Sequence, residues 1–257
     1  GASDYSGPLD KDPAFVETFI RFWSSFAKHL SRHDPEWLFL EPMNEPVFQG
    51  HVEQWPPLQE RLLKAIRENA PRHTLLATSA HWSNLETFLQ LKPLDDPNLV
   101  YNFHYYSPFF FTHQGATWSS DNVKSMRDIP YPSTPENVQK AMAAMEDEAL
   151  RKEIQQYGEE RWNAERIDAD IQKAAEWGKK FNVRITCNEF GAYNRRAAEP
   201  DRVQWTNDLR IACEKYDIGW TIWDIAGSFG ALRREDGRLT ISPGMAEALG
   251  LKSPGRK

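Results

Sequence analysis

Extended apolar segments alternate with amphipathic helical patterns along most of the chain. Within the helical patterns, apolar residues recur every three or four positions, as Phe19, Trp23 and Phe26 do. Strands that alternate with helices predict a parallel sheet with right-handed crossover connections. We expect a loop at residues 1–13, strands at residues 37–43, 75–80, 100–106, 183–190 and 219–224, and helices around residues 13–31, 58–66, 85–89, 138–145, 167–175, 203–213 and 245–249.

The connections between these segments differ in length. Those from a helix to the next strand are short, whereas those from a strand to the next helix are long, above all residues 107–134 and 225–242. Long loops after strands are typical of a (β/α)8 TIM barrel, where they build the active site at one face. The sequence offers five strands and not eight. We therefore expect a single domain over residues 1–257, with an incomplete α/β fold of the TIM-barrel type that lacks its first three βα units.

Charge and composition argue against several kinds of partner. The net charge is −6 and the basic residues form no stripe, so we expect no nucleic acid partner. The apolar segments are too short to cross a bilayer, so we expect no membrane partner. Cys187 and Cys213 fall on different expected elements, which argues against a disulfide framework and predicts two buried free thiols.

Metal and phosphate motifs are absent from the sequence. The seven histidines are scattered and form neither a His-x-His pair nor a His-Glu-x-x-His motif. The chain has no glycine-rich phosphate loop and no Gly-x-Ser-x-Gly segment. These absences disfavour a metal-dependent hydrolase, and we expect neither a metal nor a cofactor.

Two glutamates each end an apolar, strand-like segment just before a turn. Glu45 lies in a Met-Asn-Glu-Pro segment and Glu189 in a Cys-Asn-Glu-Phe-Gly segment. Both would lie at the carboxyl ends of parallel strands, so we expect the two carboxyl groups to face each other. Hydrolysis of a glycosidic bond needs such a pair, because one group protonates the leaving oxygen while the other attacks or activates water. Glu41 would share the inward face with Glu45, and it has no evident partner in the sequence.

Polar residues of the strand expected at 100–106 support this pairing. Side chains two positions apart share one face of a strand, so Asn102, His104 and Tyr106 point the same way. A hydrogen bond from Tyr106 to Glu189 would favour the charged carboxylate and leave Glu45 to hold the proton. Taken singly, each glutamate could be a solvated carboxylate and His104 a core histidine. Taken together, they favour catalysis.

Four segments carry further information: Trp37–Pro46, Asn102–Tyr106, Cys187–Gly191 and Trp220–Asp224. Their residue types, order and rough spacing resemble glycoside hydrolase family 5, the cellulase family, from its fourth barrel strand onward. The resemblance implies that Glu45 is the acid/base and Glu189 the nucleophile of a retaining mechanism. The other site residues that it implies are Asn44, which contacts a sugar hydroxyl, His104, which lines the cleft, Tyr106, which supports the nucleophile, and Trp223, which forms a platform under the sugar.

The resemblance implies an endoglucanase that cleaves β-1,4-linked glucan by double displacement with two glutamates. Its partner would be a polysaccharide or oligosaccharide, and its location would be secreted or periplasmic. The alternative is an inactive carbohydrate-binding remnant or a truncated fragment of such an enzyme. Trp82 has two interpretations, because it could stack on a sugar or pack within a loop. The sequence indicates no particular oligomeric state.

Overall fold

A computed structural model describes residues 3–252 of the chain. Internal contacts divide the chain into two compact units. The first unit contains residues 1–104 and 173–188, and the second contains residues 105–172 and 189–257. The chain therefore passes from the first unit to the second, back to the first and again to the second. The single domain expected from the sequence stays a prediction.

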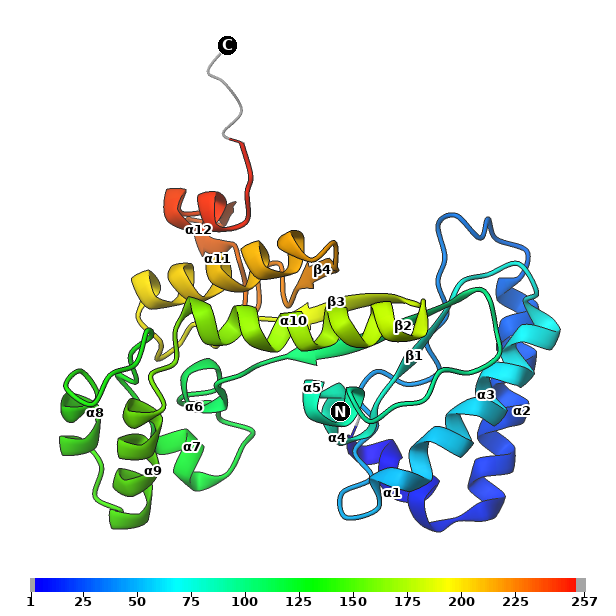
Figure 1. Ribbon diagram of the computed structural model, residues 1–257, viewed down its shortest axis with the longest axis horizontal. Helices are drawn as coiled ribbons and strands as arrows, with labels where there is room; N and C mark the ends of the chain where they lie inside the picture. Colours follow the sequence, from blue (N-terminus) through cyan, green and yellow to red (C-terminus); the bar gives the residue numbers. More distant parts are fainter. Residues whose placement is uncertain (1–2, 253–257) are drawn as a thin grey trace. The chain divides into compact units, whose positions relative to one another are not determined.

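One sheet contains the strands β1 (Leu75–Thr78), β2 (Leu99–Tyr105), β3 (Arg184–Phe190) and β4 (Gly219–Ile222), in that order (Figure 1). β1 and β2 are parallel, with Leu75 opposite Leu99 and Thr78 opposite Asn102. Each of these strands lies within or overlaps one of the apolar segments identified in the sequence. The expected alternation of strands and helices is therefore confirmed, and four of the five expected strands are present.

The strand expected at residues 37–43 is reduced to a single parallel bridge between Leu40 and Leu75. Leu40 makes two backbone hydrogen bonds at this bridge, of 3.0 and 2.9 Å. Pro42 follows two residues later, and proline has no N–H group with which to continue a ladder. The expectation of a fifth full strand is therefore wrong, and residues 3–252 form no closed barrel.

The first unit begins with helix where a loop was expected. Asp12 caps the second helix, because its carboxylate accepts hydrogen bonds from the N–H groups of Ala14 (2.9 Å) and Phe15 (3.2 Å). The loop expected at residues 1–13 is therefore wrong for residues 3–11, while residues 1–2 lie outside the described part. The helices of this unit are α1 (Ser3–Lys11), α2 (Pro13–Leu30), α3 (Trp55–Asn69), α4 (Ala80–Ser83) and α5 (Leu85–Phe88), with a 3-10 turn at Val52–Gln54. α2 packs along α3 (Figure 1).

Aromatic side chains fill the core of the first unit. Trp55 is fully buried, and its indole N–H donates to the carbonyl oxygen of Thr78 at 2.9 Å. Trp177 lies on α10 (Ala164–Phe181), in the part of that helix that belongs to this unit. Its ring packs against those of Phe88 and Tyr101, with centroids 4.8 and 5.2 Å away. These contacts fix β1 and β2 against the helices beside them.

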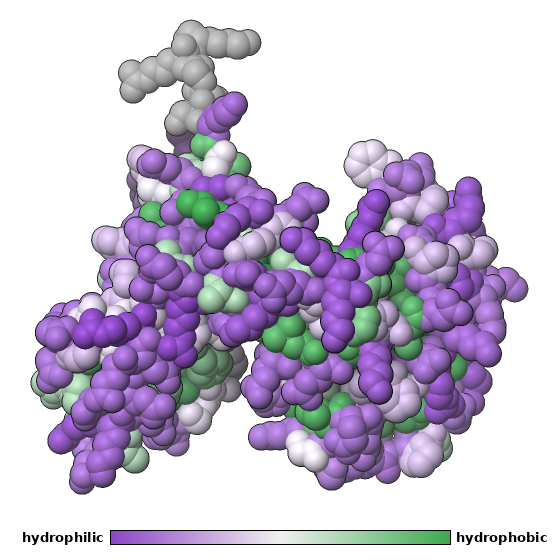
Figure 2. All heavy atoms as spheres, in the orientation of Figure 1, coloured by the Kyte–Doolittle hydropathy of each residue, from purple (hydrophilic) through white to green (hydrophobic). Residues whose placement is uncertain are grey.

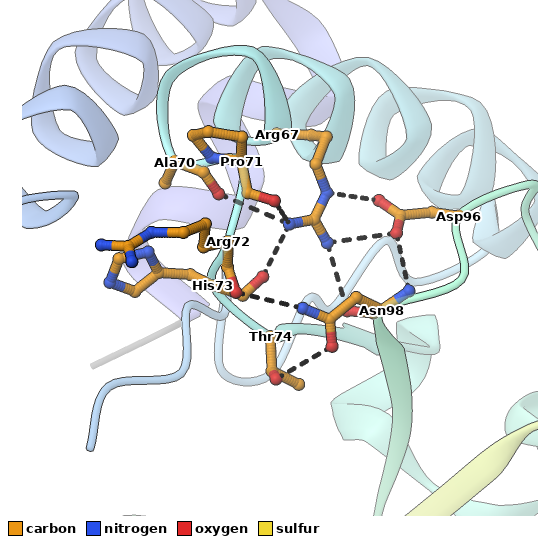
Figure 3. Close-up of polar contacts among 8 residues, drawn as sticks. All are labelled: Arg67, Ala70, Pro71, Arg72, His73, Thr74, Asp96 and Asn98. Carbon is orange, nitrogen blue, oxygen red and sulfur yellow. Dashed lines mark hydrogen bonds and ion pairs between the residues drawn. The ribbon is translucent and has the colours of Figure 1, made fainter. Parts of the chain in front are cut away.

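Arg67, near the end of α3, ties down the starts of β1 and β2 (Figure 3). Its guanidinium group donates to both carboxylate oxygens of Asp96, at 2.8 and 3.1 Å. The same group donates to the carbonyl oxygens of His73 (2.7 Å) and Asn98 (3.2 Å), which lie just before the two strands. A planar guanidinium suits such multiple acceptors. The network holds the ends of the strands opposite to the end that carries His104.

The second unit contains regular structure that the sequence did not predict. Helix α9 occupies a segment for which no element was expected, and the hairpin of β5 and β6 lies within the long connection expected at residues 225–242. The expected helices near residues 138–145, 203–213 and 245–249 are present as α8, α11 and α12. The elements of this unit beyond the sheet are α6 (Phe109–Thr112), α7 (Asp121–Ser125), α8 (Gln139–Ala143), α9 (Glu148–Glu159), the start of α10, α11 (Glu199–Lys215), β5 (Arg233–Glu235), β6 (Arg238–Thr240) and α12 (Pro243–Ala248).

Trp205 of α11 is the centre of the second core. It is fully buried, and its ring lies 6.4 Å from that of Tyr105 and 6.1 Å from that of Phe190. Its indole N–H donates to the carbonyl oxygen of Ser107 at 3.0 Å. The ends of β2 and β3 are thereby anchored to one helix within this unit. Two residues of the candidate site lie at these ends: Glu189 is the next-to-last residue of β3, and Tyr106 follows the last residue of β2.

The surface and the cysteines agree with the composition. Most side chains on the face drawn in Figure 2 are hydrophilic. None of the helices described has the length and apolar character needed to cross a bilayer. Cys187 and Cys213 are both buried, and they form no disulfide bond with each other.

Candidate active site

Glu45 lies in the first unit, in an irregular segment that follows the bridge at Leu40. Its side chain is partly buried, with 21% of its surface exposed. One carboxylate oxygen, Oε1, lies 2.8 Å from Nδ1 of His104, whose side chain is almost completely buried. His104 lies near the end of β2, so a residue of the regular sheet fixes one oxygen of a glutamate that is outside it.

The backbone around Glu45 rests on a turn that follows β1. The N–H group of Trp82 donates to the carbonyl oxygen of Pro46 at 3.2 Å. The hydroxyl of Ser83 donates to the carbonyl oxygen of Asn44 at 2.9 Å. The structure therefore brings Trp82 beside the Glu45 segment, with 39% of Trp82 exposed, and leaves Asn44 exposed. Ser83 was not singled out in the sequence, because a lone serine after a strand carries no motif.

Glu41 has a partner on the adjacent strand. The side-chain amide of Asn102 donates to Oε1 of Glu41 at 2.9 Å. The amide oxygen of Asn102 accepts a hydrogen bond of 3.3 Å from the backbone N–H of Asn188. Glu41, for which the sequence showed no evident partner, therefore has one in Asn102. Asn102 and His104 alternate along β2, and each binds the side chain of a glutamate from the same irregular segment.

Glu189 lies in the second unit, as the next-to-last residue of β3. The hydroxyl of Tyr106 donates to its Oε1 at 2.6 Å. The contact expected between these two side chains is therefore present. A hydrogen bond to the charged form of a carboxylate favours that form. Glu189 is thus held by a neutral donor, whereas Glu45 is held by an imidazole.

An aromatic cluster surrounds Tyr106 in the second unit. Its ring makes edge contacts with those of His113 (5.0 Å) and Phe229 (5.7 Å). The His113 ring also stacks on Phe109 at 4.2 Å. Burial lowers the pKa of His113 from its ordinary value of 6.5 to about 4, so the ring is neutral near pH 7. Sequence reasoning missed His113, because it lies in a long loop whose packing no periodicity reveals.

Trp223 lies directly beside the residues that follow Glu189. Its backbone N–H donates to the carbonyl oxygen of Phe190 at 2.7 Å, and 51% of the residue is exposed. A Cβ atom at Gly191 would overlap the carbonyl oxygen of Trp223. Only glycine allows this close approach, which explains the glycine in the Glu-Phe-Gly segment.

Arg202 joins the loops that follow β3 and β4. It is 3% exposed, and it donates to the carbonyl oxygens of Ala192 (3.0 Å) and Gly230 (3.1 Å). Burial lowers the pKa of Arg202 to about 10, which leaves it charged at neutral pH. The residue is a second contributor that sequence reasoning missed, since arginines on helices are usually solvated.

These contacts define two carboxylate positions with different partners. Within the first unit, Glu45 and His104 each offer one atom of a kind that can bind a metal ion. Carboxyl groups of this kind can donate a proton, accept one or attack a carbon. Exposed Trp82 and Trp223 present flat apolar rings in their respective units.

Comparison with known proteins gives a consistent assignment. Residues 3–228 match the model of the cellulase family, glycosyl hydrolase family 5. Endoglucanase 3 of Fibrobacter succinogenes is 31% identical over 98% of this chain and 38% of its own length. Endoglucanase C of Acetivibrio thermocellus is 30% identical over 84% of this chain and 61% of its own length. The chain therefore spans about two fifths to three fifths of the length of these relatives.

Solved structures show the same fold. A hyperthermophilic endo-β-1,4-glucanase, solved in complex with substrate, is 28% identical and superposes with a TM-score of 0.74. The superposition covers 96% of this chain and 69% of that structure. It confirms the expected α/β fold of the TIM-barrel type. With the family model matching most of its length, the chain belongs to glycosyl hydrolase family 5, the cellulase family.

Proposed function

We propose that this chain hydrolyses β-1,4-linked glucan with retention of configuration, with Glu45 as acid/base and Glu189 as nucleophile. The observation that carries the proposal is that each glutamate has its own polar partner. His104 Nδ1 lies 2.8 Å from Glu45, and the Tyr106 hydroxyl lies 2.6 Å from Glu189. Different partners suit two carboxyl groups with different tasks, one carrying a proton and one carrying a charge.

In the first step, the Glu189 carboxylate attacks the anomeric carbon of the sugar. The bond between that carbon and the glycosidic oxygen breaks, and Glu45 gives its proton to the departing oxygen. The product is an ester between the sugar and Glu189. Tyr106 orients the attacking carboxylate through its hydroxyl group.

In the second step, Glu45 acts as a base. It takes a proton from water, the water oxygen attacks the anomeric carbon, and the ester bond to Glu189 breaks. Glu189 regains its charge, which the Tyr106 hydroxyl stabilises. His104 keeps the Glu45 carboxyl group oriented through both steps. No cofactor or metal enters either step.

Three residues are proposed to bind the substrate. The exposed rings of Trp82 and Trp223 stack on the apolar faces of glucose units, as flat aromatic rings do. The exposed side chain of Asn44 hydrogen-bonds a sugar hydroxyl next to the reacting carbon. The endoglucanase names of the relatives support a polymeric glucan as the substrate class. Because a polymer of this kind is found outside the cell, we also propose a secreted or periplasmic location.

The direct test is the release of reducing ends from carboxymethylcellulose by the purified chain. An endo-acting hydrolase lowers the viscosity of this polymer early, while few ends have formed. Glu189→Ala should reduce the rate by about 10⁴-fold or more. Azide should restore turnover in that variant and give the α-glycosyl azide, the inverted product.

Other outcomes would contradict the proposal. Binding of the polymer without turnover would favour the carbohydrate-binding remnant. Failure of azide to restore the Glu189→Ala variant, in a protein whose parent is active, would argue against a covalent intermediate at this residue.

A further inference from the structure

Three consecutive residues after β1 adopt the left-handed backbone conformation. His81, Trp82 and Ser83 have φ angles of 57°, 59° and 56°. Residues other than glycine rarely adopt this region, and a run of three is unusual. Such backbone strain persists only where surrounding contacts enforce it, and it gathers at functional sites. The contacts of this turn therefore show what the strain maintains.

The turn binds the backbone on both sides of Glu45. The N–H group of His81 donates to the carbonyl oxygen of Val47 at 3.0 Å, and that of Trp82 to the carbonyl oxygen of Pro46 at 3.2 Å. Ser83 is completely buried, and its hydroxyl donates to the carbonyl oxygen of Asn44 at 2.9 Å. Glu45 is thus enclosed between carbonyl groups that the turn holds.

The same turn also reaches the residue that contacts the Glu45 carboxyl group. Asn84 forms a parallel bridge with His104 of β2. The side-chain amide of Asn84 lies 2.7 Å from Nδ1 of His81, which closes the turn on itself. One short segment therefore fixes both the backbone of Glu45 and the backbone of His104.

We propose that Ser83 is a positioning residue for Glu45, and that the left-handed turn clamps the acid/base in place. The proposal rests on the assignment of Glu45 as acid/base. Without the Ser83 hydroxyl, the carbonyl group of Asn44 loses its buried donor and the segment relaxes. A small displacement of the Glu45 carboxyl group then slows proton transfer to the leaving oxygen.

The kinetic test uses two substrates with different leaving groups. Protonation matters for an unactivated β-1,4-glucan oligosaccharide but hardly for 2,4-dinitrophenyl β-cellobioside, whose leaving group departs without a proton. We expect Ser83→Ala to lower kcat/KM about tenfold for the oligosaccharide and less than about twofold for the activated substrate. A loss of general stability would lower both values alike.

Ser133→Ala is the matched control. Ser133 is also buried, and its hydroxyl donates to a backbone carbonyl, that of Tyr157, at the same distance of 2.9 Å. It also accepts a hydrogen bond of 2.8 Å from the N–H group of Trp162, and both partners lie outside the Glu45 segment. This variant should change both values of kcat/KM by similar and small factors. The proposal would be overturned if Ser83→Ala and Ser133→Ala showed the same ratio between the loss of kcat/KM on the oligosaccharide and the loss on the activated substrate.

Ser83→Gly separates the hydroxyl from the backbone strain. Glycine adopts the left-handed region readily, so this variant should fold even if Ser83→Ala does not. It lacks the hydroxyl all the same, and it should show the same selective loss of about tenfold on the oligosaccharide. Parental kinetics in Ser83→Gly would mean that the hydroxyl positions nothing.

Amide hydrogen exchange tests the clamp without any turnover. The N–H groups of His81 and Trp82 donate to the Glu45 segment, so their exchange should be at least about fivefold faster in Ser83→Gly than in Ser133→Ala. Unchanged exchange would overturn the clamp. If exchange is faster in Ser83→Gly but the parent chain hydrolyses neither substrate, the clamp is supported and the hydrolase assignment is overturned instead.

Discussion

The two glutamates are held in different ways. Glu189 belongs to β3, a seven-residue strand of the sheet, and it accepts a hydrogen bond from the Tyr106 hydroxyl. Glu45 lies on irregular backbone between a single bridge and a 3-10 turn, and it contacts the His104 imidazole. The backbone of Glu189 is fixed by its strand, whereas that of Glu45 depends on a strained turn.

This difference suggests how the two chemical roles are distributed. A nucleophile must reach one carbon atom along one line, which suits a side chain on a rigid strand. An acid/base must first give a proton to a sugar oxygen and then take one from water. A loop held by specific hydrogen bonds can serve both steps, but it is exposed to changes in those bonds. We therefore expect substitutions at and around the two glutamates to affect catalysis differently.

The largest contrast should separate the two glutamates themselves. Glu189→Ala should lower kcat/KM by about 10⁴-fold or more for every substrate, because the attacking group is lost. Glu45→Ala should lower it by about 10²–10⁴-fold for glucan, and far less for 2,4-dinitrophenyl β-cellobioside. Steady-state kinetics on both substrates check this. Equal losses for the two variants on the activated substrate would erase the distinction.

The second prediction concerns the donor to Glu189. Tyr106→Phe removes the hydroxyl but keeps the ring contacts with His113 and Phe229. Loss of a hydrogen bond to a charged group is expected to lower kcat by about 10–100-fold. Tyr157→Phe is the control, because that hydroxyl also makes a 2.6 Å bond, to the carbonyl oxygen of Pro130. If both variants kept parental kcat, Tyr106 would have no part in catalysis.

The third prediction concerns the close approach behind Glu189. Gly191→Ala would drive a Cβ atom into the carbonyl oxygen of Trp223, so we expect a loss of about 1–3 kcal/mol in the free energy of unfolding. Gly244→Ala, in helix α12, serves as the control, because its Cβ atom would lie 3.5 Å from the side chain of Val203, an ordinary van der Waals distance. Urea denaturation measures both. A Gly191 variant as stable as the Gly244 variant would contradict the packing described.

The smallest expected effect is a dependence on pH in the second unit. Burial lowers the pKa of His113 to about 4, whereas the unfolded chain keeps the ordinary value of 6.5. The unfolded state therefore binds the proton first, and stability is lost as the pH falls from 6.5 toward 4. His113→Phe should flatten this part of the stability curve. His51→Gln, at an exposed site, is the control and should leave the slope of stability against pH unchanged. If His113→Phe also kept the parental slope, the lowered pKa of His113 would be contradicted.

Much of the regular structure was predictable from periodicity. The helices around Trp23, Leu62 and Leu209 were predicted because apolar residues repeat there at helical spacing, and all three are confirmed. The strands that contain Phe103 and Cys187 are also confirmed; β2 is buried along most of its length, whereas only Cys187 and Phe190 are buried in β3. These signals are strong because burial of one face decides the fold.

Other elements were missed for identifiable reasons. Helix α1 contains Pro8, which argued for a loop, and α9 is mostly polar. The hairpin of β5 and β6 is exposed and charged, so it has no apolar alternation. Its turn at Asp236 and Gly237, with φ angles of 48° and 79°, is a sequence signal that could have found it.

The residues of the candidate site could be proposed from the sequence, whereas the groups that hold their backbone could not. Glu45, Glu189, His104 and Tyr106 stood out because their polar side chains end apolar strands. The Ser83 hydroxyl acts through a left-handed turn that contains no glycine. No propensity predicts such a turn, since contacts distant in the sequence impose it.

Covalent trapping tests the account most directly. The parent chain would be incubated with 2,4-dinitrophenyl 2-deoxy-2-fluoro-β-cellobioside, whose fluorine slows both steps while its dinitrophenolate leaving group keeps the first step fast. We expect a stable adduct on the peptide that contains Glu189, identified by peptide mass mapping. An active chain that forms no adduct, or that carries the sugar on another residue, would contradict the assignment of Glu189 as nucleophile.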